Sequence, residues 1–536
     1  MFELPIELLD NKKSITDSTQ SDLQLEIVYN DLFGTQKTPS SLRKKWLNTF
    51  TTNTKYLTHT QDLLQNNISE FPTNLESLTI KIRELLDKMK TNPSFKEKYE
   101  YITVDFFEKL NHNEPILQAV SMYTLTSPIL SLLTPVIMLF IPFFILRVMG
   151  KPVTLTNYIS ELKRLFSMLP IGKLFQMGEA SWDQRGFILF SVILYFVQIY
   201  QNTLTCYKFY RNTKEMVKEI HECGYYCNLS ASSMEHFIRM TEDYDTYIPF
   251  RAILNEESQN LRKMGNDFIN VRQETYKHMG KKMKLFYDLY SDPFYNERFK
   301  FCFGFSEYIA NIRSLADINT LHTCNFSNKK TSFKNSYYSL LRYTEPIKNS
   351  YSLSKNAILS GPNASGKTTM LKSTVINIIL SQQIGMGFYD SATISPYDYL
   401  HCYINIPDSC DRDSLFQSEA RRCKEILDII HSEPNAKHLC VFDELFSGTN
   451  PYEAVACAYG YLSHIHNSTN VRYMLTTHYL NLCEMMREKK KLVTNYTLEN
   501  KYHLKKGISK IKGGIEVIEK MEFPEDIIKT AKIMVS

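Results

Sequence analysis

Two long stretches of the chain carry no charged residue, and the first of them is apolar on all faces. The first lies between Glu114 and Arg147, with its most apolar part over about 124–146, and the second covers 186–207. A helix needs about 20 mainly apolar residues to cross the hydrocarbon core of a bilayer, and both stretches reach that length. The pattern therefore predicts a transmembrane hairpin, in which two apolar helices are joined by a short amphipathic linker.

The prolines and the basic linker are compatible with more than one depth of this hairpin in a membrane. Pro128, Pro135 and Pro142 recur every seven residues, so they share one face and kink a helix there, which also suits a re-entrant or interfacial hairpin. An even number of crossings keeps both termini on one side of a membrane. The alternative without a membrane is a pair of buried core helices. The basic residues of the linker argue against its full translocation; they are Arg147, Lys151, Lys163, Arg164, Lys173 and Arg185.

The regions on both sides of the hairpin have the pattern of solvated helices. Leu75, Leu78 and Ile82 begin a stripe at helical spacing among charged residues in the N-terminal part, and the part after about residue 212 reads as long charged helices. A chain of 536 residues is too long for one ordinary domain. The net charge of +5 gives no strong indication of nucleic acid, and the 11 scattered cysteines fit a reducing compartment.

The C-terminal third contains a strand, a glycine-rich loop and a helix in direct succession. Residues 357–359 form a short apolar run, and Gly361, Gly366, Lys367 and Thr368 follow at the spacing of a phosphate-binding loop. The glycines allow backbone N–H groups to turn toward phosphate oxygens, and the start of the helix adds its dipole. Lys367 would reach the β- and γ-phosphates, and the Thr368 hydroxyl would bind Mg²⁺. The pattern predicts binding of ATP with Mg²⁺.

Two further apolar runs end in residues that can carry out hydrolysis. Residues 439–442 are followed by Asp443 and Glu444, and the run that begins at Tyr473 leads to His478. Asp443 would hold the Mg²⁺ ion through its water shell, while Glu444 would orient and deprotonate the attacking water. His478, at the end of a strand, would contact the γ-phosphate. Together with the loop, these runs predict a Mg²⁺-dependent ATPase.

The segments GPNASGKTT, DELFSGTN and TTHY resemble the ATPase domain of the MutS family. Ser414-Leu-Phe followed by Glu419 is similar to the family's signature segment, and Asn349 stands at the position that contacts the nucleotide base. The resemblance extends over about 340–536. It includes the C-terminal segment, in which the matching residues are Gly507, Ser509, Gly514, Pro524 and Ala531.

This resemblance implies an α/β P-loop NTPase domain of the ABC-like and MutS-like kind, with ATP and Mg²⁺ as cofactors. In such domains two copies face each other, and ATP lies between one phosphate loop and the partner's signature segment. We therefore expect a homodimer in which Ser414 acts on the nucleotide bound by the other copy. Catalysis is expected from Glu444, His478 and Lys367, and metal binding from Thr368 and Asp443. The nucleotide-binding residues implied are Asn349, Gly361, Pro362, Asn363, Ala364, Ser365, Gly366, Lys367, Thr368, Thr369 and Ser414.

The chain also departs from the family pattern. Arg412 stands where a glycine usually precedes the signature serine, and Ser447 replaces an arginine in the loop after Glu444. No mismatch-recognition domain is visible, because helical sequence and the apolar hairpin take its place. We expect four regions: a helical N-terminal domain over 1–112, two apolar membrane segments with their linker over 113–210, a helical lever-like region over 211–330 and the MutS-like ATPase domain over 331–536.

Two functions compete at this point. The first is a membrane-associated MutS-like ATPase with its ATPase domain in the cytoplasm, which couples ATP-driven dimer closure to lever movement, with DNA as a candidate partner. The alternative is a soluble cytoplasmic or nuclear ATPase of DNA mismatch repair or recombination, which binds mismatched or branched DNA and keeps the apolar runs in its core. A third reading, an ABC-type transport ATPase, is disfavoured because an LSGGQ-type signature is missing.

Overall fold

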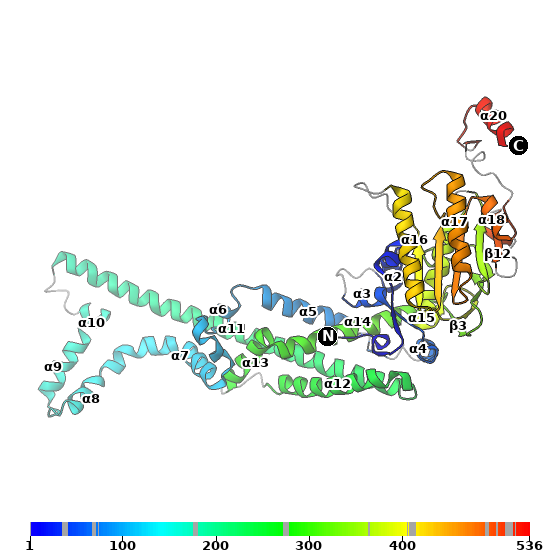
Figure 1. Cartoon of the computed structure of the whole chain (residues 1–536). Helices are drawn as coiled ribbons and strands as arrows, with labels where there is room; N and C mark the ends of the chain where they lie inside the picture. Colours follow the sequence, from blue (N-terminus) through cyan, green and yellow to red (C-terminus); the bar gives the residue numbers. More distant parts are fainter. Residues whose placement is uncertain are drawn as a thin grey trace. The chain divides into compact units, whose positions relative to one another are not determined.

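The chain folds into two compact units (Figure 1). Unit 1 comprises Met1–Pro72, Ser233–Glu256 and Gly304–Ser536, and unit 2 comprises Thr73–Ser232 and Glu257–Phe303. Three helices, α11, α12 and α14, contain residues of both units. The computed structural model describes residues 2–34, 41–66, 71–72, 74–174, 181–271, 278–362, 365–404, 406, 414–487, 493–499, 502–509, 518–519 and 521–535.

Unit 1 is built on a six-stranded, mostly parallel sheet with the order β13-β12-β6-β11-β10-β9. Only β13 runs antiparallel to its neighbour. β6 and β10 are apolar and buried along almost their whole length, as expected for central parallel strands covered on both faces. In sheet order the strands are His503–Lys506, Val493–Glu499, Asn356–Ser360, Val471–Thr477, His438–Asp443 and Tyr399–Tyr403.

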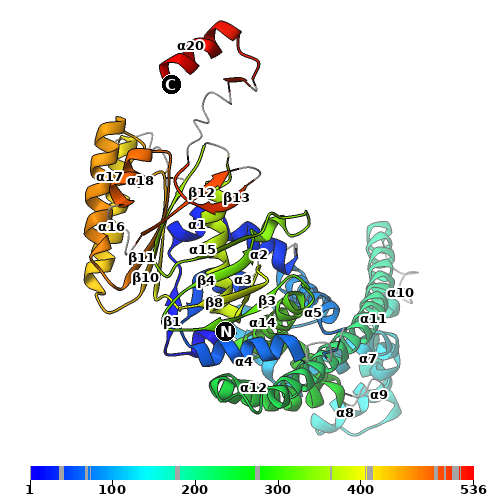
Figure 2. The same cartoon turned by 90° about the vertical axis from the view of Figure 1, so that its right-hand side faces the viewer.

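Helices cover both faces of this sheet (Figure 2). α15 lies on one face, and α16, α17 and α18 lie on the other. The α/β fold expected from the sequence is therefore present in the C-terminal part of the chain. The bounds of these helices are Lys367–Ile384 for α15, Leu415–Ser432 for α16, Pro451–His466 for α17 and Leu480–Arg487 for α18; α20 (Glu525–Val535) is the last described helix.

A second, five-stranded sheet has the order β5-β4-β8-β3-β7. Its strand β3 (His322–Phe326) pairs in parallel with β8 (Ser391–Ile394). Because β3 precedes residue 331, unit 1 extends further toward the N-terminus than the ATPase domain expected from the sequence. The other strands of this sheet are β4 (Ser332–Ser336), β5 (Asn349–Ser352) and β7 (Met386–Gly387).

The N-terminal segment is part of unit 1 and packs on the C-terminal half of α15. Gln383, which is buried in that helix, donates from Nε2 to the carbonyl oxygens of Trp46 (2.6 Å) and Thr49 (2.8 Å). Gln61 donates to the carbonyl of Gly385 at 2.5 Å. Buried amides need such partners, so the segment satisfies groups that α15 alone would leave unpaired. Its elements are β1 (Lys12–Ser14), α1 (Asp17–Leu23), α2 (Leu25–Phe33), α3 (Ser41–Asn48), β2 (Thr49–Thr51) and α4 (Thr54–Asn66).

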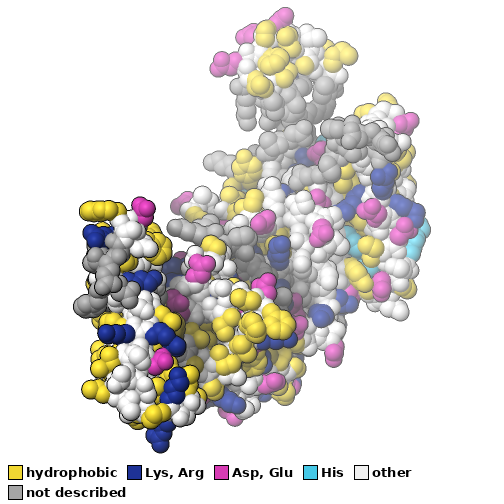
Figure 3. Space-filling view, turned by 90° about the vertical axis from the view of Figure 1, so that its left-hand side faces the viewer, with side chains coloured by type: hydrophobic (Ala, Val, Ile, Leu, Met, Phe, Trp, Pro, Cys, Tyr) yellow, Lys and Arg dark blue, Asp and Glu magenta, His cyan; other side chains and the backbone are white. Residues whose placement is uncertain are grey.

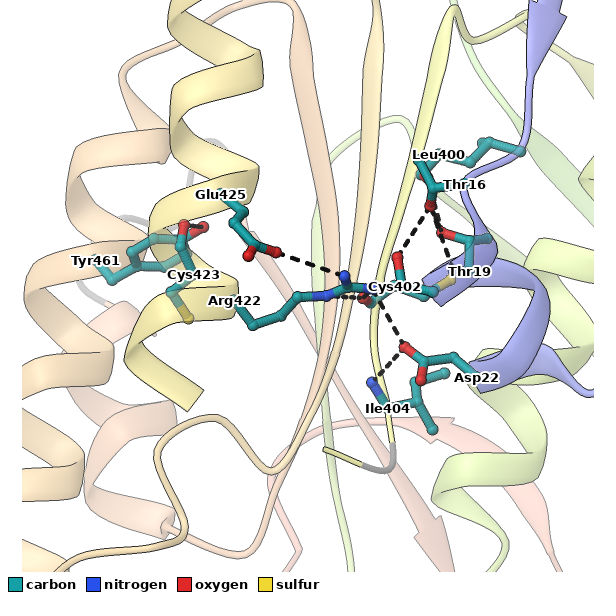
Figure 4. A network of polar contacts seen from close by, with 11 residues as sticks. Thr16, Thr19, Asp22, Leu400, Cys402, Ile404, Arg422, Cys423, Glu425 and Tyr461 are labelled. Atoms are coloured by element: carbon teal, nitrogen blue, oxygen red, sulfur yellow. Dashed lines mark hydrogen bonds and ion pairs between the residues drawn. The ribbon is translucent and has the colours of Figure 1, made fainter. Parts of the chain in front are cut away.

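A polar network joins this segment to the edge strand β9 and to α16 (Figure 4). Asp22 of α1 accepts a hydrogen bond from the Ile404 backbone N–H at 3.1 Å and lies 3.8 Å from the Arg422 guanidinium. Arg422 also donates to the Cys402 carbonyl at 3.0 Å. The division of the chain into units therefore differs from the separate domain expected over 1–112. Residues up to Pro72 belong to unit 1, together with the large sheet.

The described regular elements of unit 2 are all helices. Its core lies around α13 (Met279–Ser291), where Met283, Phe286 and Leu289 are buried. The other helices are α5 (Asn74–Thr91), α6 (Phe95–Lys98), the 3₁₀ helix η3 (Asp105–His112), α7 (Glu114–Met138), α8 (Ile141–Val148), α9 (Leu155–Phe166), α10 (Pro170–Leu174), α11 (Trp182–Met240), α12 (Ile248–Ile269) and α14 (Pro293–Ala316).

The two apolar stretches form helices whose apolar side chains are largely uncovered. The first stretch is divided between α7 and α8, with Pro142 in the first turn of α8, while Pro128 and Pro135 lie inside α7. The second stretch lies within the single long helix α11. Among the described helices, α7 and α11 are long and apolar enough to cross a membrane, and only 17% and 11% of their apolar windows is buried. That exposure does not fit the alternative of two core helices.

Candidate active site

A pocket of about 770 Å³ opens in unit 1 beside the N-terminus of α15. Its wall contains the loop residues Ser365 to Thr369 on one side and Asp443 and Glu444 on another. Tyr338, Leu341 and Tyr502 are among the other lining residues. Because β6, β11 and β10 are parallel neighbours, the segments that follow their carboxyl ends meet here. The topology thus brings together the three segments that the sequence predicted as one site.

Lys367 is buried at the first position of α15 and is held by the loop in front of it. Its Nζ donates to the carbonyls of Gly361 and Pro362, each at 3.0 Å, and lies 3.6 Å from Glu444 Oε1. Gly366 adopts φ = +87° at the N-cap of α15, which only a residue without Cβ takes easily. The ammonium group is therefore placed where an anion at the helix N-terminus would meet both the charge and the helix dipole.

Thr368 and Asp443 form the second part of the site. The Thr368 hydroxyl donates to Asp443 Oδ2 at 2.6 Å. The other carboxylate oxygen, Oδ1, accepts a hydrogen bond from the hydroxyl of Thr476, which is the direct neighbour of Asp443 across β10 and β11. A hydroxyl and a carboxylate that face a phosphate loop are hard oxygen donors, and this donor set suits Mg²⁺.

Glu444 follows β10 in an unusual backbone conformation, with φ = +53°. Its backbone N–H donates to the Thr476 carbonyl at 3.1 Å, which fixes this turn to the neighbouring strand. Its Oε1 lies 3.6 Å from Nδ1 of His478, at the end of β11. Interaction with His478, together with the positive charge of Lys367, holds the pKa of Glu444 below its ordinary value. The carboxylate is thus kept ionised, as a general base requires.

Ser414 lies at the N-cap of α16 and does not line the pocket of its own chain. Its hydroxyl accepts from Gln417 N–H at 3.3 Å, and the Gln417 side chain accepts from Ser414 N–H at 2.8 Å. One turn later, the buried Glu419 accepts hydrogen bonds from the backbone N–H groups of Ser447 and Gly448, both at 3.1 Å. The signature segment is therefore tied to the loop that follows Glu444.

Asn349 lines the pocket at the start of β5, and its amide is already engaged. It donates to the Tyr502 carbonyl at 3.2 Å and accepts from Leu504 N–H at 2.8 Å. In this arrangement Asn349 fixes the segment that carries the Tyr502 ring beside Gly366. Its predicted contact with the nucleotide base stays a prediction.

Of the remaining loop residues, Ser365 and Thr369 line the pocket. Ser365 has a buried hydroxyl that makes no hydrogen bond to another described residue. Together with the Lys367 ammonium and the Thr368–Asp443 pair, this free hydroxyl fits a loop that binds a phosphate group with a metal ion. Asn363 and Ala364 lie outside the described residues, as does Arg412.

Comparison with known proteins gives the same assignment for this region. Residues 357–536 match the family model of MutS domain V. The match includes the three predicted catalytic residues, Lys367, Glu444 and His478. It also includes Asp443, the carboxylate of the predicted metal site.

The MutS-like region is also similar to curated relatives over part of their length. The DNA mismatch repair protein MutS of Phocaeicola vulgatus is 30% identical over 186 residues, which are 32% of this chain and 21% of that protein. Endonuclease MutS2 of Staphylococcus saprophyticus is 28% identical over 189 residues, 34% of this chain and 24% of that protein. Endonuclease MutS2 of Staphylococcus haemolyticus is 28% identical over 212 residues, 38% of this chain and 26% of that protein. The chain thus matches about a quarter of the length of these relatives.

Thr476 is the functional residue that the sequence motifs missed. Its hydroxyl contacts Asp443, and its carbonyl and hydroxyl both accept from Glu444 N–H, so it positions both acids of the site. The signal was present, because Thr476 stands two residues before His478 on an apolar strand, where an inward-facing hydroxyl needs a polar partner. Identifying that partner required the register between β10 and β11.

Proposed function

We propose that this chain binds ATP with Mg²⁺ and hydrolyses it as a MutS-type ATPase. The observation that carries the proposal is that Lys367, the Thr368–Asp443 pair and Glu444 line one pocket, with His478 placed 3.6 Å from Glu444. Each pair has the chemistry that one step of hydrolysis needs, and all come from neighbouring parallel strands. The match of residues 357–536 to MutS domain V supports the same reaction.

The residues of the pocket divide the work as follows. When ATP binds, Lys367 exchanges its hydrogen bonds to the loop carbonyls for bonds to phosphate oxygens. Its buried charge therefore keeps partners throughout. Thr368 and Asp443 hold Mg²⁺, which when bound neutralises phosphate charge. Glu444 accepts the proton of the attacking water. His478 keeps Glu444 ionised and restricts its direction.

A second copy of the chain would complete the site. Ser414 is placed at the start of α16, outside the pocket of its own chain, so it can meet a nucleotide only on another copy. We propose a homodimer in which the two signature segments face the two phosphate loops. Ser414 of this chain would then meet the nucleotide bound by the partner. The hydrogen bonds that Glu419 accepts from the loop after Glu444 would connect that contact to this chain's own base.

DNA is the partner that the relatives favour. The relatives are a DNA mismatch repair protein and an endonuclease by name, which supports the DNA repair or recombination alternative over the membrane reading. We propose that hydrolysis is coupled to DNA. The purified protein should hydrolyse ATP faster with branched or mismatched duplex than without DNA, and the stimulation should fall steeply with salt. A turnover rate that no DNA structure changes would remove the DNA part of the proposal.

Association with a membrane is the second candidate, and a separate observation favours it. Large apolar side chains on α7, α8 and the first half of α11 are exposed. The match to the family model begins at residue 357 and so does not include these helices. Burying one such side chain stabilises a protein by about 1.5–3 kcal/mol, so leaving this many in water is unfavourable. Carbonate extraction of expressing cells tests the candidate: the protein should stay with the membrane pellet, and full release would exclude it.

Lys367→Ala and Glu444→Gln separate the two parts of the ATPase proposal. Lys367→Ala should weaken ATP binding itself, because it removes the buried ammonium group from the loop. Glu444→Gln should keep binding and lose turnover, because it removes the base and leaves the phosphate loop intact. If both variants lost ATP binding equally, the division of roles between Lys367 and Glu444 would be wrong.

A further inference from the structure

An uncharged band on α11 has the length of a membrane's hydrocarbon core. Arg185 and Lys208 are the charged residues on either side of it, and none lies between them. At a rise of 1.5 Å per residue, 186–207 is about 33 Å long. The hydrocarbon core of a typical bilayer is about 30 Å thick, so one such helix with a modest tilt spans it completely.

The band exposes many large apolar side chains, and some of its polar side chains bond to α7. Tyr195 Oη donates to the Ser131 carbonyl of α7 at 2.7 Å, and Asn202 Nδ2 donates to Ser131 Oγ at 2.8 Å. Cys206 Sγ lies 3.6 Å from the Leu125 carbonyl. These three polar groups of the band therefore meet α7. The exposed large side chains of α11 in the same band are apolar or aromatic and include Phe187, Leu189, Phe190, Ile193, Leu194, Phe196 and Tyr200. Exposed polar side chains, which are Gln198, Gln201, Thr203 and Thr205, lie in the C-terminal half of the band.

Hydroxyl groups on the band are satisfied inside their own helices. Thr134 donates to the Leu130 carbonyl and Thr203 to the Ile199 carbonyl, both at 2.8 Å. Ser191 donates to the Ile188 carbonyl, also at 2.8 Å. A surface that faces lipid cannot leave a hydroxyl unpaired, so these bonds are compatible with lipid around the helix pair.

Aromatic and basic side chains mark both ends of the band. At its start, Trp182 is 85% exposed and the Arg185 guanidinium lies 5.2 Å from its ring. At its end, Tyr207 and Tyr210 are exposed and flank Lys208. Tyrosine and tryptophan are enriched where a membrane helix leaves the hydrocarbon, and nearby lysine and arginine extend to the headgroups. Two such belts, one band length apart, correspond to the two interfaces of a bilayer.

The segment between the two apolar helices is built for a membrane surface. α9 exposes Leu155 and Ile159 on an apolar face and carries Lys163 and Arg164, the pattern of a helix that lies in the headgroup region. Arg147, Lys151 and Lys173 add further positive charge near it. In Figure 3, which looks at this end, hydrophobic side chains cover much of the nearest part and Lys and Arg side chains lie among them.

We propose that α7, α8 and the first half of α11 cross a lipid bilayer completely as a two-helix hairpin. In this arrangement α9 lies on the membrane surface opposite to the one at which the hairpin enters. This inference rests on the membrane candidate of the proposed function. The basic residues of the α8–α10 segment oppose translocation, but a re-entrant hairpin would leave them within the hydrocarbon, where charged side chains are more unfavourable still. A full crossing brings them to the far headgroups.

Protease protection of the full-length protein tests this topology. The protein is reconstituted at low density in phosphatidylcholine–phosphatidylserine vesicles, which are captured through a C-terminal affinity tag so that the ATPase region faces outward. Trypsin is added with and without detergent, and peptides are quantified by mass spectrometry. Cleavage after the exposed Lys505 and Lys506 should be equal in both conditions. Cleavage after Lys163, Arg164 and Lys173 should rise at least about tenfold with detergent.

Two other outcomes would each overturn the proposal and can be told apart. Equal cleavage of the α8–α10 segment without detergent, in protein that resists carbonate extraction, would show a hairpin that enters and leaves by the same surface. Membrane association would then stand and only the crossing would be wrong. Release of the protein by carbonate would remove both the membrane candidate and the crossing.

Discussion

Glu444 and His478 directly follow the neighbouring strands β10 and β11, and their Oε1 and Nδ1 atoms lie 3.6 Å apart. His478 therefore acts on the charge state of the predicted base. Replacing His478 by Asn should raise the pKa of Glu444 toward its ordinary value, because the interaction that lowers it is lost. A base with a lowered pKa stays active to lower pH, so the acid limb of the kcat profile should move to higher pH in the variant. We expect a rate loss of roughly tenfold at neutral pH. An acid limb that does not move would contradict the pairing.

Thr476 should set the affinity of the site for Mg²⁺. Thr476→Val removes the hydroxyl that holds Asp443 Oδ1 and leaves the volume almost unchanged. The Mg²⁺ concentration that gives half-maximal ATPase activity should rise by about tenfold, a usual effect of losing a residue that orients a metal ligand. Thr477→Val, on the next position of the same strand, is the matched control, because its hydroxyl accepts from Tyr479 N–H instead. Equal Mg²⁺ dependence in the two variants would exclude the role of Thr476.

Asp22 should make the stability of unit 1 depend on pH. Burial raises the pKa of Asp22 from 3.8 to about 6, against the opposing effects of the Ile404 N–H and Arg422. A raised pKa means that the folded protein disfavours the ionised form. The contribution of Asp22 is therefore most favourable at low pH, where it is protonated, and is lost as pH rises through about 6; the difference is at most about 3 kcal/mol.

Urea unfolding between pH 4 and pH 7.5 (about the range of this titration) measures the effect. Asp22→Asn should abolish this part of the pH dependence and gain stability relative to the parent as pH rises. Asp17→Asn, an exposed change on the same helix, should leave the slope unchanged. The same slope in the parent and in Asp22→Asn would show that Asp22 does not titrate in this range.

Leu194 and Tyr225 distinguish a lipid-facing surface from a water-facing one. They lie on the same helix and are 50% and 51% exposed, but only Leu194 lies near the middle of the uncharged band. Arginine at the centre of a membrane helix costs about 2.5–3.5 kcal/mol, whereas arginine on a surface in water costs almost nothing. Leu194→Arg should therefore lower the membrane-bound fraction several-fold, and Tyr225→Arg should leave it unchanged. If Leu194→Arg had no effect, the band would face water.

The sequence predicted which segments lie at one pocket better than it predicted the boundaries of the fold. The loop before Lys367 and the acids after β10 could be found because each follows a buried apolar strand at a characteristic spacing, and the structure brings them to one pocket. The break between α7 and α8, just ahead of Pro142, agrees with the proline spacing. These features depend on local sequence alone.

The missed features depend on contacts between distant parts of the chain. The placement of the N-terminal segment rests on amides such as Gln61 and Gln383, which bond to backbone groups more than 300 residues away in the sequence. No periodicity marks those partners. The short strand β3, only His322–Phe326, gave no alternation long enough to be distinguished from a loop, which placed the domain boundary too late.

Glu444→Gln tests the central claim most directly. The variant keeps the side-chain size and the phosphate loop but cannot accept a proton from water. ATP binding and phosphate release are measured on the same purified preparation in detergent with Mg²⁺. We predict binding within about threefold of the parent and a turnover rate at least about 100-fold lower. Phosphate release at the parent rate would contradict the assignment of Glu444 and, with it, the account of this pocket as the site of hydrolysis.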